Sequence, residues 1–443
     1  MNETFMKERP VGRLVFQMAV PMVLSMLVSS LYNIIDSYFV AKISEEAMTA
    51  LSLVYPLQNI INAVAIGFGI GVNAAISFYL GAREKEKASK SAVMGLVYNC
   101  IHGIILGAVC IIIVPYFISF YTSDALTASY AVSYGRIVFA FSLFNCAQMT
   151  FEKIYQALGR MKTAMMCVLT GSIINIILDP LMIFGLGPFP SMGIKGAALA
   201  TGIGQSLPLV IYIILTAVRP LSVNLSLKNI TFSTSAAKRL YGVGIPAALN
   251  LAFPSVLISA LNAILAAFGE VYVLVLGVYY KLQNFVYLTA NGIVQGIRPL
   301  MGYNYGAKEY KRVRQIYKTA LLFSAVIMAV GTILCLAVPG WIFSLFTENP
   351  DTVKEGAKAL RIICAGFIVS AVSVTTCGSL EGLGKGTASM TVTLLRYIVV
   401  IIPAAFILSR FMAADGVWAA FALTEAVCAV ISFVLYKKKI DVK

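Results

Sequence analysis

Long apolar segments, each separated from the next by a short polar stretch, run through the whole chain. An α-helix needs about 20 apolar residues to cross the hydrocarbon core of a bilayer, and these segments reach that length. The strands of a membrane β-barrel are much shorter. We therefore predict twelve transmembrane helices, at residues 14–40, 47–80, 91–115, 130–157, 162–186, 193–218, 239–268, 271–303, 315–339, 356–383, 387–411 and 414–436.

The composition excludes an ordinary soluble domain. Hydrophobic residues make up 59% of the 443 positions and charged residues only 12%, whereas soluble proteins carry about 25% charged residues. The chain begins with a polar stretch that runs into a full-length apolar span without a small-residue cleavage site, so we expect the first span to be retained.

The basic residues that give the chain its net charge of +15 are unevenly distributed between alternate loops. Lysine and arginine gather in the N-terminal stretch and in every second loop, namely 7–13, 83–90, 160–162, 219–239, 308–318, 385 and 437–443. The alternate loops hold few basic residues. Because cytoplasmic loops are enriched in lysine and arginine, both termini are predicted to be cytoplasmic. The basic balance therefore indicates a membrane topology and not a nucleic-acid partner.

The sequence repeats itself at an offset of 225 residues. Pro21 corresponds to Pro246, Gly67 to Gly292, and the pair 158–159 to 383–384. Each half contains six predicted spans, so both halves enter the membrane in the same sense, as parallel repeats do. We predict two pseudo-symmetric six-helix bundles: an N-lobe at 1–218, a cytoplasmic linker at 219–237 and a C-lobe at 238–443. Two such lobes are typical of transporters that alternate access to a site between them.

Two carboxylates lie deep inside predicted spans, where a charged side chain costs about 2.5–3.5 kcal/mol and is usually functional. Asp36 shares a helix face with Tyr32 and Asn33, and Asp179 follows Asn175 by one turn. If the two helices meet, their oxygens can form a cation switch, since burial favours a protonated carboxyl group and oxygen atoms can also bind Na⁺. A hydrogen-bonded packing role is the alternative.

Other polar positions are weaker candidates. Pro21 would kink the first span and serve as a hinge. A substrate cavity is predicted from Asn33, Gln58, Asn62, Gln283 and Asn284; these side chains would otherwise form interhelical hydrogen bonds. The roles of Glu152 and Glu381 stay open between a surface position and a functional one. Lys281, Arg298 and Arg396 are basic groups in the later spans that could pair with carboxylates or carbonyls, and Glu425 is expected to be an interior structural partner.

The sequence resembles a known family, the MATE multidrug and toxin extruders, and within it the MepA-like bacterial branch on the DinF side. The similarity spans nearly the whole chain, with matching stretches at 31–36, 80–82, 175–180, 193–201, 302–307 and 383–385 and at Arg396 before Pro403. The resemblance implies a twelve-helix bacterial cytoplasmic-membrane antiporter that exchanges H⁺ or Na⁺ for amphiphilic, often cationic, compounds.

The same resemblance implies a cation site in the N-lobe. Asp36, Asn175, Asp179 and Thr201 match its positions, with Tyr32 beside them, and Na⁺ could bind at the two carboxylates. Some relatives also carry an acidic residue early in the seventh span. Here that region, residues 244–250, contains none, which argues against a C-lobe cation site of that kind.

The sequence thus predicts an ion-driven exporter that needs no cofactor and acts as a monomer on small molecules among membrane lipids. No phosphate-binding loop is complete, because Ser379 and Gly386 occupy positions that require glycine and Ser or Thr, so direct ATP coupling is not expected. An intramembrane enzyme is disfavoured by the lack of catalytic motifs. The alternative function is a flippase for a lipid-linked saccharide or another amphiphilic metabolite.

Overall fold

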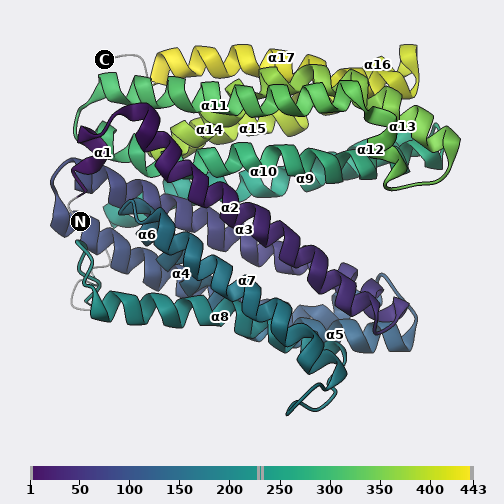
Figure 1. Cartoon of the computed structure of the whole chain (residues 1–443), viewed down its shortest axis with the longest axis horizontal. Helices are drawn as coiled ribbons and strands as arrows, with labels where there is room; N and C mark the ends of the chain where they lie inside the picture. The colour runs from purple at the N-terminus through teal and green to yellow at the C-terminus, as the bar shows by residue number, and fades with distance from the viewer. Residues whose placement is uncertain (1–2, 227–229, 231–233, 440–443) are drawn as a thin grey trace. The chain divides into compact units, whose positions relative to one another are not determined.

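A computed structural model describes residues 3–226, 230 and 234–439. The described chain is helical throughout, which confirms the predicted fold class (Figure 1). Eleven of its helical segments are long and apolar enough to cross a membrane. The helices of the first half are α1 (Phe5–Glu8), α2 (Val11–Ala41), α3 (Glu45–Gly81), α4 (Lys85–Ser119), α5 (Ala125–Ala140), α6 (Ser142–Ala157), α7 (Met161–Phe184) and α8 (Ile194–Val218).

The second half has the same order of helices with more interruptions. Its elements are α9 (Thr234–Ala266), α10 (Glu270–Gly306), α11 (Tyr310–Ala337), α12 (Pro339–Ser344), α13 (Pro350–Ile363), the 3-10 turn η2 (Cys364–Gly366), α14 (Phe367–Gly382), α15 (Gly386–Leu394), the π-helical turn η3 (Leu395–Val399), α16 (Ile401–Met412) and α17 (Ala414–Lys439).

The fourth predicted span, 130–157, is formed by two helices and not one. α5 ends at Ala140 and α6 begins at Ser142, and Phe141 between them makes a tight turn in which its N–H bonds to the carbonyl of Val138. The ring of Phe141 occupies the space beside Gly202, where a Cβ atom would lie 2.3 Å from the ring. Periodicity does not reveal such a one-residue break, since the two 16-residue helices follow each other without a polar linker.

The repeat found in the sequence recurs in the helix boundaries. α3 begins at Glu45 and α10 at Glu270, while α6 and α14 agree at both ends, all with the offset of 225. The caps agree as well: Asp124 accepts a hydrogen bond from the N–H of Thr127 at the start of α5, and Asn349 caps α13 in the same way. The two halves therefore share equivalent helix boundaries and N-caps.

The helices form two compact units, each described by itself. Unit 1 consists of residues 1–3 and 24–248, and unit 2 of residues 4–23 and 249–443. Two long helices thus change unit part way along: α2 between residues 23 and 24, and α9 between residues 248 and 249. The predicted lobe boundary at 219–237 stays a prediction; residues 227–229 and 231–233 of that stretch lie outside the described residues.

Small residues let the exchanged helix segments pack closely. In unit 1, a Cβ atom on Gly67 of α3 would lie 2.4 Å from the backbone nitrogen of Ala248. In unit 2, a Cβ atom on Gly292 of α10 would meet the backbone of Val23 at 2.7 Å. These contacts are equivalent in the repeat, and close backbone approach at glycine is a common way to pack membrane helices.

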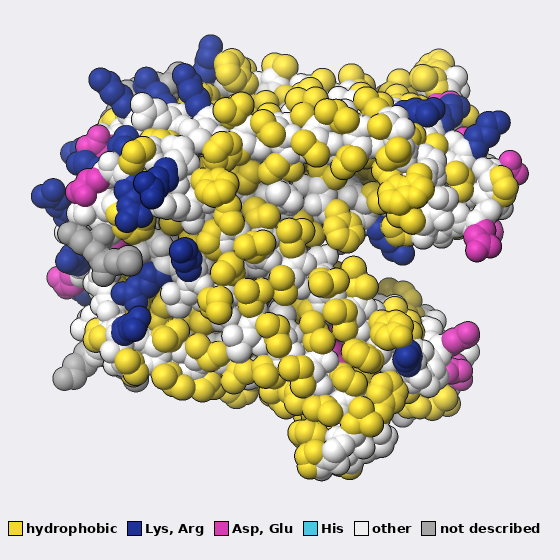
Figure 2. Space-filling view, in the orientation of Figure 1, with side chains coloured by type: hydrophobic (Ala, Val, Ile, Leu, Met, Phe, Trp, Pro, Cys, Tyr) yellow, Lys and Arg dark blue, Asp and Glu magenta, His cyan; other side chains and the backbone are white. Residues whose placement is uncertain are grey.

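The visible surface fits a bilayer. Apolar side chains cover the lengths of the helices, while Lys, Arg, Asp and Glu side chains gather at the helix ends (Figure 2). Large hydrophobic residues such as Ile112, Tyr116 and Val330 are more than half exposed. Exposed apolar surface on this scale is compatible with lipid and not with water. The chain is a multi-pass membrane protein.

Candidate functional site

The two carboxylates singled out in the sequence lie together in unit 1. Asp36 comes from α2 and Asp179 from α7, and their carboxyl groups lie within hydrogen-bonding reach of each other. Asp179 is fully buried and Asp36 is 8% exposed. Two facing carboxylates repel one another unless a proton or a cation lies between them. The arrangement can therefore hold one positive charge.

Polar neighbours surround this pair. Asn175, one turn before Asp179, donates to Asp179 Oδ2 at 3.3 Å and accepts from the backbone N–H of Thr201 at 3.1 Å when its amide is oriented to satisfy both ends. Tyr32 lies near both carboxylates on the face of α2 that carries Asp36. The structure thus brings together all five residues of the predicted cation site.

The site has oxygen atoms left to bind a ligand. Asp36 Oδ1, Asp179 Oδ1 and Thr201 Oγ1 are buried and have no hydrogen-bond partner among the described residues. Buried polar atoms are nearly always paired, so an unpaired group calls for an explanation such as a bound water or ion. A carboxylate and hydroxyl oxygen set suits Na⁺ or a protonated carboxyl group. These residues therefore fit the coupling ion expected from the sequence.

One member of the site was missed by the sequence analysis. Tyr134 of α5 is 2% exposed and lies beside Asp36, Tyr32 and Thr201. A tyrosine in an apolar segment resembles any core aromatic residue, so only its position in the fold reveals this contact. The hydroxyl group adds another polar atom next to the carboxylates.

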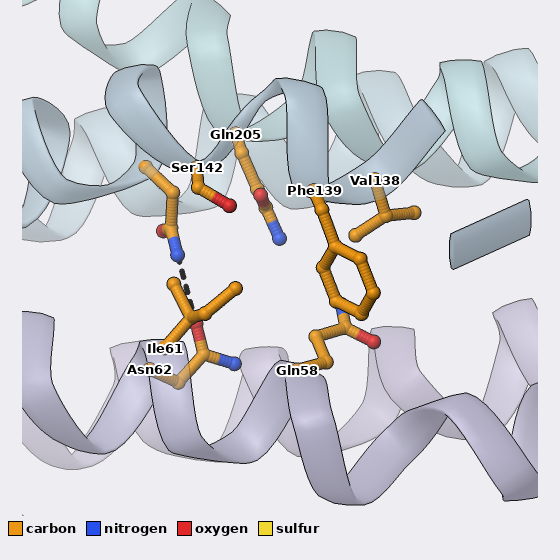
Figure 3. A pocket seen from close by; sticks show the side chains of 8 residues that line it. Gln58, Ile61, Asn62, Val138, Phe139, Ser142 and Gln205 are labelled. Carbon is orange, nitrogen blue, oxygen red and sulfur yellow. Dashed lines mark hydrogen bonds between the residues drawn. The ribbon is translucent and has the colours of Figure 1, made fainter. Parts of the chain in front are cut away.

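A small polar pocket with room for about one water molecule lies in the same unit. Gln58 and Asn62 project into it from α3, facing Ser142 of α6 and Gln205 of α8 (Figure 3). Asn145 donates to Asn62 Oδ1 at 2.8 Å, drawn as the dashed line in Figure 3. The walls combine neutral amide groups with apolar Ile61, Val138 and Phe139.

The pocket adjoins the carboxylate pair through two helices. Gln205 follows Thr201 by one turn on α8, and Val138 follows Tyr134 by one turn on α5. Residues four apart share a helix face. The lining of the pocket therefore lies one helical turn from the residues that surround Asp36 and Asp179.

The remaining predicted residues have less specific surroundings. Asn33 is exposed, and its amide donates to the carbonyl of Ser29 in the same helix at 2.7 Å. Gln283 is half-buried and Asn284 is exposed, both on α10 in unit 2. Pro21 lies inside the continuous helix α2, two residues before that helix changes unit. Their proposed roles in a cavity and a hinge stay predictions.

Unit 2 contains a buried ion pair with a full set of hydrogen bonds. Arg396 Nε donates to both carboxylate oxygens of Glu425, at 2.8 and 3.1 Å, and Arg396 Nη2 donates to Glu425 Oε1 at 2.5 Å. The same Nη2 also donates to the hydroxyl of Tyr287 at 3.0 Å, which donates onward to Ser370. Arg396 lies in the π-helical turn η3, and Glu425 is its interior partner.

A second buried ion pair in unit 2 joins α10 to α14. Arg298 Nη2 lies 2.7 Å from Glu381 Oε2, and Glu381 Oε1 accepts hydrogen bonds from Asn250 and Ser389, both at 3.1 Å. Glu381 is only 4% exposed, so its position near a helix end does not make it a surface residue.

The other residues whose roles the sequence left open divide between core and surface. In unit 1, Lys153 pairs with its neighbour Glu152 at 2.8 Å, and both are buried. In unit 2, Lys281 is exposed. The buried pair is therefore part of the interior of its unit, whereas Lys281 belongs to the surface.

Comparison with known proteins agrees with this architecture. The multidrug export protein MepA of Staphylococcus haemolyticus is 26% identical over 434 residues, which cover 98% of this chain and 95% of that protein. MepA of Staphylococcus aureus strain MSSA476 is 25% identical over 97% of this chain and 94% of its own length.

Solved structures share the fold. A crystal structure of MATE in the straight conformation matches with a TM-score of 0.93 and 24% identity, covering all of this chain and 98% of that one. A MOP-superfamily transporter from Pyrococcus furiosus matches equally well, with a TM-score of 0.93, 22% identity and the same coverage. The family model MatE matches residues 21–181 and 246–407, once in each repeat. The chain therefore belongs to the MatE family of membrane transporters.

Proposed function

We propose that this protein is a secondary active exporter of amphiphilic, cationic small molecules, driven by an H⁺ or Na⁺ gradient through alternating access. One observation carries the proposal: Asp36 and Asp179 face each other in unit 1, with unpartnered oxygens and a polar pocket one turn away. The similarity to proteins named for multidrug export supports the export of drugs.

The coupling follows from charge. With its carboxylates unloaded, the site is negative and attracts a cationic molecule to the polar residues beside it. Binding of H⁺ or Na⁺ by Asp36, Asp179, Asn175 and Thr201 neutralises that charge and removes the attraction, so the substrate leaves. A ligand shifts a conformational equilibrium only by its different affinity for the two states. Ion and substrate therefore compete for the same charge and favour opposite states.

The proposal includes a location and a topology. The protein would act as a monomer in the bacterial cytoplasmic membrane, with both termini in the cytoplasm, as the basic loops predict. Its substrates would enter from the cytoplasm or the surrounding lipid, and the ion gradient would supply the energy without a cofactor.

The test is ethidium efflux from proteoliposomes under an imposed pH gradient or a Na⁺ gradient, applied separately. Wild-type protein is expected to export the dye under one gradient, and Asp36→Asn to abolish that export while the protein remains folded. Asp351→Asn makes the same change at an exposed position of α13 and is expected to behave as wild type. Gradient-driven export by Asp36→Asn at the wild-type rate would refute the role of the carboxylate.

The flippase alternative has less support. A flippase would need a groove rich in basic residues, and the second half of the chain contains four that could line one: Lys281, Arg298, Arg361 and Arg396. Two of them are neutralised by buried carboxylates, Arg298 by Glu381 and Arg396 by Glu425. An absence of dye movement under both gradients, with intact protein, would nevertheless turn the assignment toward a lipid-linked or specialised metabolite.

A further inference from the structure

The ion pair of Arg298 and Glu381 has neutral counterparts in the other repeat. Subtracting the offset of 225 places Asn73 at the position of Arg298 and Gln156 at that of Glu381. Both amides are 2% exposed on α3 and α6, the helices that correspond to α10 and α14. The same helix packing is thus built in unit 1 with uncharged side chains at these two positions.

A buried ion pair is an expensive way to fill such positions. Removing two charges from water costs more than a neutral or apolar replacement of similar volume, so a buried pair is weak evidence for a stabilising role. Unit 1 does hold a buried pair, Glu152 with Lys153, but those residues correspond to Cys377 and Gly378 of unit 2. Gln156 Nε2 donates to Glu152 Oε1 at 2.6 Å, and Asn73 Nδ2 donates to the carbonyl of Lys153 at 3.1 Å. Unit 1 therefore has its ion pair beside these two positions, whereas unit 2 has its ion pair on them.

The site around this pair has an unused donor and an unused acceptor. Arg298 Nε and Asn250 Oδ1 are both buried, and neither has a hydrogen-bond partner in the part of the chain that the structure describes. The guanidinium contacts Glu381 through Nη2, and the Arg298 side chain is 16% exposed. Asn250 is half-buried on α9, with its amide nitrogen already shared between Glu381 and Ser389. The groups without partners are thus the Arg298 Nε–H, which belongs to the positive guanidinium, and Asn250 Oδ1, whose amide group bonds to the negative Glu381.

We propose that Arg298, Glu381 and Asn250 form a binding site in unit 2 for a zwitterionic group that carries an ammonium and a carboxylate. The carboxylate would accept from Arg298 Nε, and the ammonium would donate to Asn250 Oδ1 and Glu381. A net-neutral site with separated charges matches a net-neutral ligand with separated charges. This inference rests on the proposed function only in assigning the bound group to a transported amphiphile.

The test compares two fluorescent probes that differ in one group. Nε-dansyl-lysine carries the ammonium and the carboxylate, whereas its methyl ester lacks the carboxylate charge. Binding to the full-length protein in nonionic detergent is followed by dansyl fluorescence. The double variant Arg298→Asn/Glu381→Gln installs the residues of the other repeat. We expect it to weaken binding of the acid by roughly ten- to a hundredfold, the value of a hydrogen bond to a charged group, and to change ester binding much less.

The outcomes separate the possibilities. Equal binding of both probes by wild type and variant would mean that a water molecule alone fills the site, and would overturn the proposal. Equal loss of both probes would indicate a structural role and also overturn it. If the double variant does not fold, Arg298→Lys decides: it keeps the positive charge but removes the guanidinium donors, so the preference for the acid over the ester should still fall.

The result is independent of ion coupling. Binding in detergent needs no gradient, so a selective loss of the acid stands even if Asp36→Asn still exports ethidium. Conversely, the protein could export ethidium under a gradient while the substitutions at 298 and 381 leave binding of both probes unchanged. That result would support the proposed function and refute this binding site.

Discussion

The buried pair of Arg396 and Glu425 gives a quantitative prediction for stability. Glu425→Gln keeps the shape of the side chain but removes the negative charge that three hydrogen bonds from Arg396 surround. Arg396 is 7% exposed, so its charge would remain buried without compensation. Breaking such a pair by removing one partner costs about 3–5 kcal/mol.

The corresponding shift can be measured as a melting temperature. In a unit of about 200 residues, each kcal/mol lowers the midpoint by about 2–4 °C, so Glu425→Gln should melt on the order of 10 °C below wild type. The assay is gel filtration of detergent-solubilised protein after heating, with the monodisperse peak followed by fluorescence.

A second variant separates the charge from the packing. Arg396→Met/Glu425→Leu removes both charges and keeps apolar volume, so it should be more stable than Glu425→Gln, as replaced buried pairs often are. A midpoint for Glu425→Gln within about 2 °C of wild type, less than 1 kcal/mol on this scale, would refute the reasoning. So would a double variant that melts below the single one.

Two further predictions concern helix packing and capping. Gly67→Ala places a Cβ atom 2.4 Å from the nitrogen of Ala248 and should destabilise the protein by about 1–3 kcal/mol, whereas Gly242→Ala has nothing within 4 Å and should not; thermal melting of the two variants checks the contrast. At the start of α5, hydrogen bonds from the side chain and backbone of Thr127 hold the pKa of Asp124 below its usual value. The stabilisation from Asp124 is therefore fully present above the unfolded pKa of about 4 and is lost as the pH falls through the lower folded value. Asp124→Asn, which installs the cap that Asn349 provides in the other repeat, should melt with a weaker dependence on pH over that range; an unchanged dependence would contradict this assignment.

Much of the fold could be predicted because periodicity and length report directly on membrane helices. The spans, the repeat and the depth of Asp36 and Asp179 all follow from positions along one helix at a time. The break at Phe141 could not be predicted, because no polar or proline-containing linker marks it in the sequence, and the contact of its ring with Gly202 involves another helix.

The candidate site shows the same division. Asn175 and Asp179 are one turn apart on the same helix, so their proximity can be predicted from the sequence. Tyr134 joins them only through tertiary packing, and its sequence neighbourhood is that of an ordinary core residue. Glu381 lies near a helix end, yet Arg298, 83 positions earlier in the chain, and Asn250 cover it. Contacts between distant segments decide such cases, and no pattern along one segment reports them.

The change of unit within α2 and α9 bears on how such a chain could arise. A chain of half this length could not complete a unit alone, because the first part of its first helix would belong elsewhere: residues 4–23 pack in unit 2, and the start of α9, up to residue 248, packs in unit 1. Two copies that exchanged those segments would complete each other, as in a domain-swapped dimer. Duplication and fusion of a gene for such a dimer would produce this reciprocal exchange. Segments once exchanged between two ancestral molecules would then be exchanged between two parts of one chain.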